Sequence, residues 1–337
     1  MPSFTSDAIF SPLDGARAAV LRRTGRTSRR FFVDREARVA LYAVTSITFS
    51  FVLTCAAPLW LIAVGPILLG VPHLLADFRY LVVRPGLHAR PGFWWMMAFP
   101  AVLTWIWPTV SMGLVACAGA ILLARGSRLS KVVACVAWLG VFALARLGGR
   151  TSDIVFAHLH NLVAVALWLT WARRTQKLHA WVLGLFLVAG AAIFSGFVEQ
   201  ITWKMHGFDF PGNAVEIDRL VRTLSPFADP YLGLRLVLFF AFAQAVHYAI
   251  WLRWIPEEDR PRAGMRTFAS SYRALVEDVG AWPLFIFAIV TVVLVGWALF
   301  DLRAARDGYL RMAIFHGHLE IAVAMLLLLE GRRARAV

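Results

Sequence analysis

The segment 281–300, AWPLFIFAIVTVVLVGWALF, decides the fold class of this chain, because it contains no charged residue and is as long as a helix that crosses a bilayer. About 20 apolar residues in an α-helix cover the ~30 Å of hydrocarbon. The whole chain has the same character: of its 337 residues, 60% are hydrophobic and 16% are charged, against about 45–50% and 25% in soluble domains. The sequence therefore predicts an all-α fold, a polytopic integral membrane helical bundle.

Apolar segments separated by short polar breaks predict about ten transmembrane helices. They are 38–56, 58–83, 93–108, 109–126, 132–149, 150–172, 178–196, 231–254, 281–300 and 312–331. Segments 93–108 and 109–126, divided at Pro108, are short enough to be the halves of a broken or re-entrant element. The predicted organisation is a transmembrane domain over 38–331 between two basic tails, 1–37 and 332–337.

Basic residues gather on one side of the predicted spans. The chain has 34 Lys and Arg against 20 Asp and Glu, a formal net charge of +14. With the N-terminus inside, the loops that begin near residues 84, 127, 173, 255 and 332 are rich in Arg, as the positive-inside rule requires of cytoplasmic loops. Both termini are therefore expected in the cytoplasm, and the charge does not indicate nucleic-acid binding. The exceptions, near outer turns, are Arg146, Arg150, Arg303, Arg306 and Arg311.

Two loops are long enough to contain helices of their own. In the outer loop, 197–230, apolar residues of Asn213–Leu224 recur near helical spacing, which predicts an interfacial helix able to cover a cavity. In the inner loop, 257–280, an amphipathic helix is expected around Phe268–Val276. The N-terminal tail is expected to be a solvated arm, with a basic segment over Ala16–Arg30 as a candidate for anionic lipid.

Histidines are the main polar exceptions within the apolar segments. Apart from His179, at the very start of the span 178–196, six of the nine fall inside predicted spans: His73, His158, His160, His247, His316 and His318. Ionisable groups are costly at membrane depth, so they usually face the interior of a bundle and carry function. A single such histidine would more simply make a hydrogen bond between helices. Their number on one chain indicates a shared site.

Helical spacing groups these histidines with carboxylates and amides. His73 and Asp77 are four residues apart and share a helix face, as do His316 and Glu320. Gln244 and His247 are three apart. Within each HxH pair, 158/160 and 316/318, the two imidazoles diverge by ~200° around a regular helix, so the two members are expected to have different roles.

The four motif-bearing spans run parallel, so their imidazoles can converge. Neutral imidazoles with one or two carboxylates suit iron, zinc or copper, and open positions on such a centre suit oxygen activation. We expect His73, His160, His247 and His318 as first ligands. His158 and His316, with the candidate catalytic carboxylates Asp77 and Glu320, are expected around them or in a second site. A membrane oxygenase acting on a hydrophobic substrate with O₂ follows from this arrangement.

Two other classes of protein fit the same residues. A transporter would use His, Asp and Glu at mid-membrane as a substrate or proton site, although histidines outnumber carboxylates here and no internal repeat is seen. A haem protein would place two imidazoles on opposite faces of a porphyrin. No GxSxG motif supports a serine nucleophile, and Cys55, Cys117 and Cys135 lie in apolar stretches without a CxxC pair.

The motif Gly70-x-Pro72-His73-x-x-x-Asp77 resembles the GxPHxxxD motif of the Brp/Blh-type bacterial membrane β-carotene 15,15'-dioxygenases. The segments around His158 and His160, His247, and His316 and His318 lie where that family also places histidines. The resemblance implies a bacterial inner-membrane enzyme that binds non-haem Fe²⁺ through four histidines and cleaves β-carotene with O₂ to give retinal. The chain departs from the family pattern at Leu74-Leu75 and Phe78.

Overall fold

The computed structural model describes residues 3–23, 31, 33–171, 179–211, 215–227, 229–260 and 266–331. Every regular element within these ranges is a helix. In chain order they are α1 (Ser3–Arg23), α3 (Arg35–Ala56), α4 (Pro58–Phe78) with the π-helical turn Arg79–Val83, a 3₁₀ turn (Leu87–Ala89), the π-helical turn Trp94–Ala98 with α5 (Phe99–Leu103), α6 (Val110–Leu123), α7 (Arg128–Gly148), α8 (Arg150–Thr170), α9 (His179–Phe194), α10 (Phe197–Lys204), α11 (Ile217–Leu224), α12 (Pro230–Ala249) with the π-helical turn Ile250–Trp254 and α13 (Ile255–Glu258), α14 (Phe268–Val279), α15 (Ala281–Phe300) and α16 (Leu302–Glu330).

The helices identify a multi-pass membrane protein. Among the described residues, seven helices are long and apolar enough to cross a bilayer, and the count becomes eight if α9 and α10, bent by 68°, form one span. The prediction of about ten spans differs at the segments 93–108 and 109–126. There the chain forms two shorter apolar helices, Trp94–Leu103 and Val110–Leu123. The second is 14 residues long, which gives about 21 Å of helix.

Short polar side chains set where several helices begin. Asp229 accepts hydrogen bonds from the backbone N–H groups of Tyr231 and Leu232, with Pro230 in the first turn of α12. Asp301 accepts one from Ala304 at the start of α16. Such caps satisfy the N–H groups that have no partner inside the helix. Because of its cap, α16 begins ten residues before the predicted span 312–331, and its first turns contain arginines.

Many large apolar side chains point outward, and several ionisable ones are buried within the apolar core. On α7 and α15, Leu147 and Phe300 are 85% and 93% exposed. Glu320, in contrast, is completely buried, and His73 is 1% exposed. A bundle with this distribution has an outer surface suited to lipid and an interior that holds the costly polar groups.

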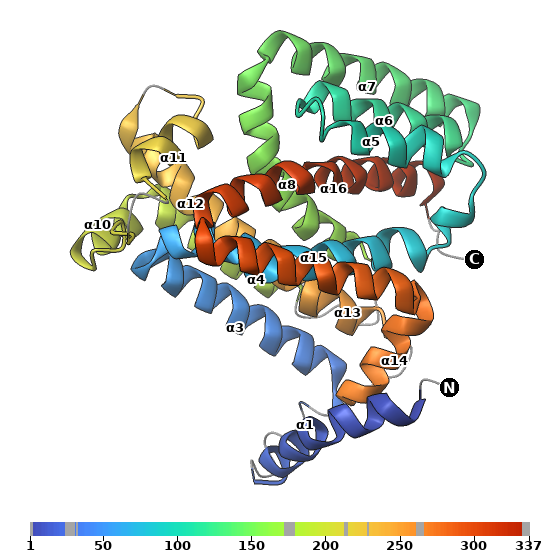
Figure 1. Cartoon of the computed structure of the whole chain (residues 1–337). Coiled ribbons are helices and arrows are strands. Elements are labelled where there is room, and N and C mark those ends of the chain that lie inside the picture. Colours follow the sequence, from blue (N-terminus) through green and yellow to red (C-terminus); the bar gives the residue numbers. More distant parts are fainter. Residues whose placement is uncertain are drawn as a thin grey trace.

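The four helices that bear the intramembrane histidines pack against one another. α16 contacts α4 and α8, and α12 contacts the same two helices. In Figure 1 the red α16 crosses the green α8 in the middle of the bundle. The predicted convergence of these helices is therefore present in the fold.

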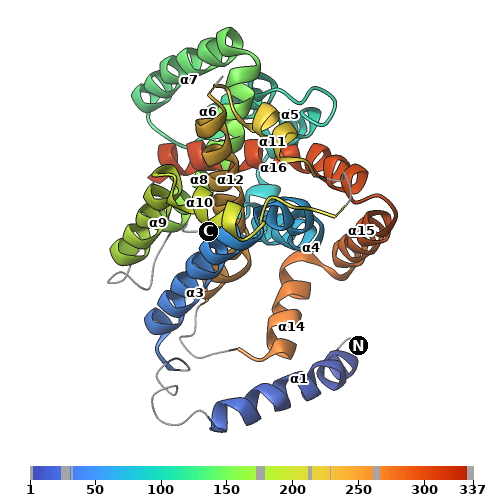
Figure 2. The ribbon, with the colours of Figure 1, turned by 90° about the vertical axis from the view of Figure 1, so that its left-hand side faces the viewer.

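The two predicted loop helices lie at opposite ends of the bundle (Figure 1). α11 and α10 form one end, onto which Figure 2 looks. α14 lies at the other end and packs against α1. Both amphipathic helices were predicted, at 213–224 and 268–276, whereas a helix over Ser3–Arg23 was not. Part of the basic segment 16–30 lies outside the described residues.

Candidate metal centre

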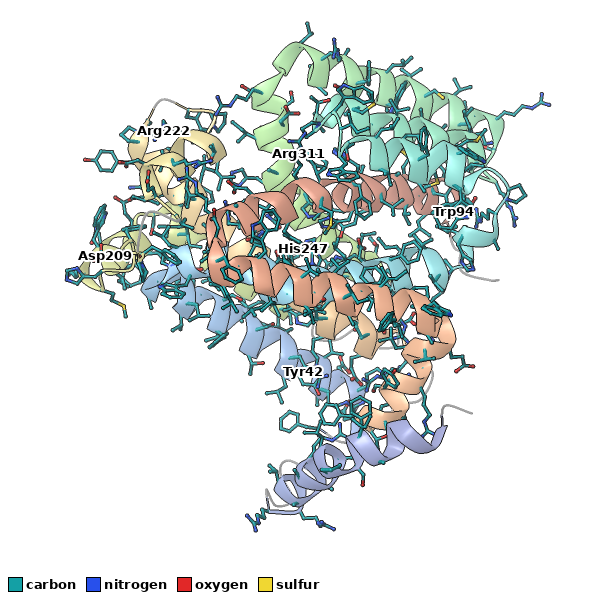
Figure 3. The ribbon with its side chains drawn as sticks, viewed as in Figure 1. Tyr42, Trp94, Asp209, Arg222, His247 and Arg311 are labelled. Carbon is teal, nitrogen blue, oxygen red and sulfur yellow. The ribbon has the colours of Figure 1, made fainter. Side chains whose placement is uncertain are left out.

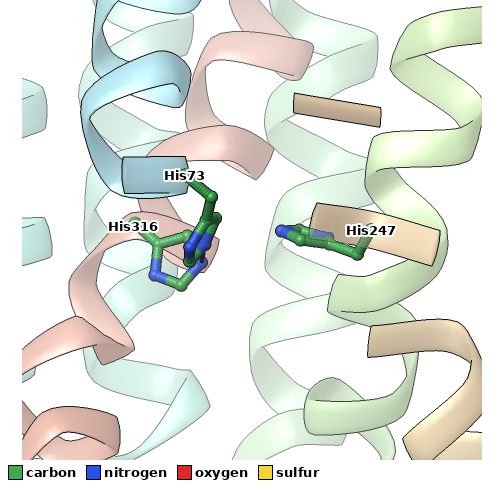
Figure 4. A group of neighbouring side chains, drawn as sticks. All are labelled: His73, His247 and His316. Atoms are coloured by element: carbon green, nitrogen blue, oxygen red, sulfur yellow. Dashed lines mark hydrogen bonds between the residues drawn. The ribbon is translucent and has the colours of Figure 1, made fainter. Parts of the chain in front are cut away.

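Three histidines from three different helices meet in the centre of the bundle (Figures 3 and 4). His73 comes from α4, His247 from α12 and His316 from α16. The Nε2 atoms of His73 and His316 are 3.2 Å apart, and the ring centroids of His73 and His247 are 5.3 Å apart. One nitrogen from each of the three rings lies within 4.8 Å of the others.

A second group shares His247 with the first. It adds His160 of α8 and Glu320 of α16, with the three ligand atoms again within 4.8 Å of one another. His160 Nδ1 lies 3.1 Å from one oxygen of Glu320, and His247 Nε2 lies 3.8 Å from the other. The His160 ring is also 4.6 Å from the ring of His316, so the two groups form one cluster of four imidazoles and a carboxylate.

The spacing of atoms within each of the two groups fits a bound cation. Two ligands that each bind a metal at about 2.05 Å lie between about 2.9 and 4.1 Å apart, for angles from 90° to 180° at the metal. The three distances of 3.2, 3.1 and 3.8 Å all fall in this interval. Imidazole with one carboxylate is a donor set for iron, zinc or copper.

Several cluster atoms are buried without a hydrogen bond of regular geometry. Among the described residues these include His247 Nε2 and both carboxylate oxygens of Glu320. A buried polar atom without a partner is costly, and a buried carboxylate without a cation or proton much more so. A bound cation would remove this cost, so the residues present fit a metal ion.

Local packing aims two of the imidazoles. The Nδ1–H of His316 donates to the carbonyl of Ala313, one turn earlier on α16, which leaves Nε2 with its lone pair directed at His73. Gly317 lets α16 approach His160, because a Cβ at that position would lie 2.7 Å from His160 Nδ1. Metal ligands in proteins are commonly oriented by such outer hydrogen bonds.

In each HxH pair one imidazole lies in the cluster and the other points away from it, as their helical spacing predicts. His158 points away from the cluster, and its Nε2 donates to the Leu224 carbonyl at 2.8 Å. His318 stacks on Phe156, with ring centroids 4.3 Å apart and an interplanar angle of 11°. His316 therefore takes the position expected for His318, because it shares a helix face with Glu320 while His318 points to another.

Asp77 is buried at 2% exposure, and one of its oxygens has no hydrogen-bond partner among the described residues. It belongs to neither ligand group, although it lies one turn after His73 on α4. Its place is beside the cluster rather than in it.

Tyr248, to which sequence reasoning gave no role, has its ring 4.6 Å from that of His73. Its only signal in the sequence is its adjacency to His247.

A cavity of about 240 Å³ opens directly onto the cluster. Its polar lining includes all four clustered histidines, His318, Tyr248, Asn161, Gln244, Asp153, Tyr309 and Arg306. The rest is largely apolar, with Phe156, Phe240, Leu310 and Ile314 among the lining residues. An apolar chamber with a few convergent polar groups is typical of a small-molecule site.

No protein-family model, curated protein or solved structure matches this chain.

Proposed function

We propose that this chain is a membrane oxidoreductase in which His73, His160, His247, His316 and Glu320 hold a non-haem metal ion. The observation that carries the proposal is the buried cluster of four imidazoles and one carboxylate, whose atoms face one another at 3.1–3.8 Å beside an apolar cavity. Iron, as Fe²⁺, is the ion that we favour, with zinc and copper as the alternatives that the same ligands accept.

The cavity supports an apolar substrate. When bound, non-haem iron would supply the activation of O₂ for oxidation of a lipid or carotenoid. The chain's own part is to exclude water and to position the substrate: Phe156 and Phe240 line the cavity, and the helices around it expose apolar surface to lipid. Tyr248 and Asn161 offer polar groups at the edge of the cluster. On the motif resemblance, oxidative cleavage of β-carotene to retinal is the specific reaction to test.

The orientation proposed from the loop charges agrees with the order of the helices. With the N-terminus in the cytoplasm, α14 lies on the inner side and α10 and α11 on the outer side. Eight spans, or ten if Trp94–Leu103 and Val110–Leu123 each cross, both return the C-terminus to the cytoplasm. We therefore propose a bacterial inner-membrane protein with both termini inside.

The metal proposal is tested by elemental analysis of the purified full-length protein. We expect close to stoichiometric iron, zinc or copper in the wild type. His160→Gln should lose most of this metal, because the amide cannot replace the imidazole in the cluster. His158→Gln, on the same helix two residues away, is the matched control and should retain it. Folded wild-type protein that is consistently free of metal would overturn the proposal.

The substrate is tested separately in cells that accumulate β-carotene. Loss of carotene with formation of retinal in the extracted lipids would support the carotenoid reaction. Bound metal with unchanged carotene would restrict the proposal to another lipid. Transport of a solute by metal-free protein in vesicles would instead favour the transporter alternative, in which the same histidines form a substrate or proton site.

A further inference from the structure

A second cavity, of about 360 Å³, adjoins the histidine-lined one at the α11 end of the bundle. The two cavities share Leu224, Arg306 and Leu310 as lining residues. The first is largely apolar. The second also has an apolar part, formed by Val215, Leu220, Leu224 and Leu310, but adds the charged side chains of Glu216, Arg219, Arg303, Arg306 and Asp307. The apolar cavity could hold the hydrocarbon chain of an amphiphile, and the charged side chains of the second cavity could hold its polar head group.

Positive charge is in excess in the second cavity. Arg306 donates to the Ile62 carbonyl and to Asp307, both at 2.9 Å, and Arg219 approaches the other oxygen of Asp307 at 3.5 Å. Asp307 is thus shared by two guanidinium groups. Arg303 forms no ion pair within the described part of the chain. Arg303 and Arg306 are among the exceptions to the positive-inside rule, so the preference of basic residues for cytoplasmic loops does not explain them.

The distance between the charged cavity and the cluster can be read along α16. Lining residues of the first cavity recur on one face of this helix, from Arg306 through Leu310 and Ala313 to Gly317. Ten residues separate Arg306 from His316, a rise of about 15 Å. A group held by Arg306 would therefore lie well away from the reacting position.

Helix α11, which lines the second cavity and contributes Leu224 to the first, is held in place by α8. Arg150 donates to the Arg222 carbonyl at 3.0 Å, and His158 donates to that of Leu224 at 2.8 Å. These bonds satisfy carbonyls at the end of α11 that have no partner inside the helix. They give His158 a structural role and fix Leu224 at the boundary between the two cavities.

We propose that the two cavities together bind a single-chain lipid with an anionic head group. The hydrocarbon chain lies in the histidine-lined cavity, and the carboxylate or phosphate head lies against Arg303 and Arg306. Guanidinium groups recognise both kinds of oxyanion through paired hydrogen bonds. The inference deepens the proposed function and rests on it for the reaction, but binding itself requires no metal.

The test compares ligands that differ only in the head group. Full-length protein in nanodiscs, stripped of metal with a chelator, is titrated with palmitate, hexadecanol and palmitoyl lysophosphatidate. We expect palmitate or lysophosphatidate to bind at least about tenfold more tightly than hexadecanol, since hydrogen bonds to charged groups are the stronger ones. The better of the two anions identifies the head group. Equal affinity for all three, or no binding, would overturn the inference.

Variants separate a specific head-group site from general charge. Arg303→Gln and Arg306→Gln should each weaken binding of the anionic lipid by about five- to tenfold and leave hexadecanol unchanged. Arg311→Gln, also on α16 but outside both cavities, is the matched control. If Arg306→Gln fails to fold because it loses the bond to Ile62, Arg303→Gln carries the test alone. An equal loss in Arg311→Gln would contradict the assignment.

The failure of this inference and that of the proposed function are distinguishable. Selective binding of the anion by protein that never contains metal would refute only the oxidoreductase. Stoichiometric metal without head-group selectivity would refute only the anionic substrate.

Discussion

Glu320 is the residue whose burial most needs a cation. It is fully buried in the middle of α16, and the imidazoles of His160 and His247 lie 3.1 and 3.8 Å from its oxygens. No Lys or Arg forms an ion pair with it among the described residues. Three other buried glutamates, Glu199, Glu257 and Glu330, have an arginine partner: Glu199, for example, lies 3.1 Å from Arg235. The contrast assigns Glu320 to the cluster rather than to helix packing.

Replacing Glu320 by Gln removes the charge with little change of volume. A ligand present at 100 times its dissociation constant stabilises a protein by about 2.7 kcal/mol, so added Fe²⁺ should raise the thermal midpoint of the metal-stripped wild type. We expect this increase to shrink strongly in Glu320→Gln, measured by thermal unfolding in detergent with and without metal. Glu199→Gln should lower the midpoint but keep the increase. The same increase in Glu320→Gln would remove the carboxylate from the site.

At the scale of elements, close helix contacts through glycine hold the short segments against the core. A Cβ on Gly119 of α6 would overlap the backbone carbonyl of Met96, in the turn before α5. Small residues let helices approach in this way where no hydrophobic effect drives them together in lipid. The pair of short helices thus packs on the bundle through backbone contact.

Gly119→Ala should therefore destabilise the protein by about 1–3 kcal/mol, the usual cost of overpacking. The measurement is the thermal midpoint in detergent, with metal content as a second readout. Gly140→Ala, in α7, is the matched control, because a Cβ there meets nothing within 4 Å. A loss of stability as large in Gly140→Ala would show that helix packing at Gly119 is not the cause.

One carboxylate links α1 to the start of α14. Asp14 accepts hydrogen bonds from the backbone N–H groups of Phe268 and Ala269 at 2.8 and 3.3 Å, so a side chain from α1 caps the start of α14. The ring of Phe10 lies 5.3 Å from that of Tyr272 in the same contact.

Asp14→Ala should release α1 from α14 and speed its cleavage in limited proteolysis several-fold, since a lost cap costs about 1 kcal/mol. Ser11→Ala, at an exposed position of the same helix, should digest like the wild type. Unchanged cleavage of Asp14→Ala would mean that other contacts hold the two helices together.

At the scale of the whole molecule, the two ends of the bundle differ in kind. The α10–α11 end carries the charged cavity and the exposed residue Asp209, whereas the α1–α14 end carries Glu277 on an exposed position. The cluster lies between them (Figure 3). The orientation of the bundle in the membrane therefore decides from which compartment the charged cavity is reached.

Single cysteines placed in a cysteine-free background test the orientation. Asp209→Cys should react with an impermeant maleimide in intact cells, and Glu277→Cys only after the membrane is opened. The positive-inside distribution of the loops is the reason for this expectation. The reverse labelling pattern would invert the proposed topology.

The sequence by itself determined the fold class, the central spans and which histidines lie within the apolar helices. Charge-free runs such as 281–300 and the cost of ionisable groups in hydrocarbon are local properties, readable from composition and spacing. Helical spacing also separated His158 from His160, and the structure sends them to a backbone carbonyl and to the cluster respectively.

Only the tertiary structure decided which atoms meet. Rotation of α16 places His316, not His318, opposite His73, and no spacing along one helix fixes its rotation against another. The length of Val110–Leu123 likewise depends on how the chain turns near Pro108. Hydropathy therefore predicted a full span over 109–126, where a shorter helix forms. The position of Arg306 between two cavities could not be predicted for the same reason, because residues of α4, α6, α8, α11, α12 and α16 line them together. Distances between helices arise from packing, which is a property of the assembled bundle.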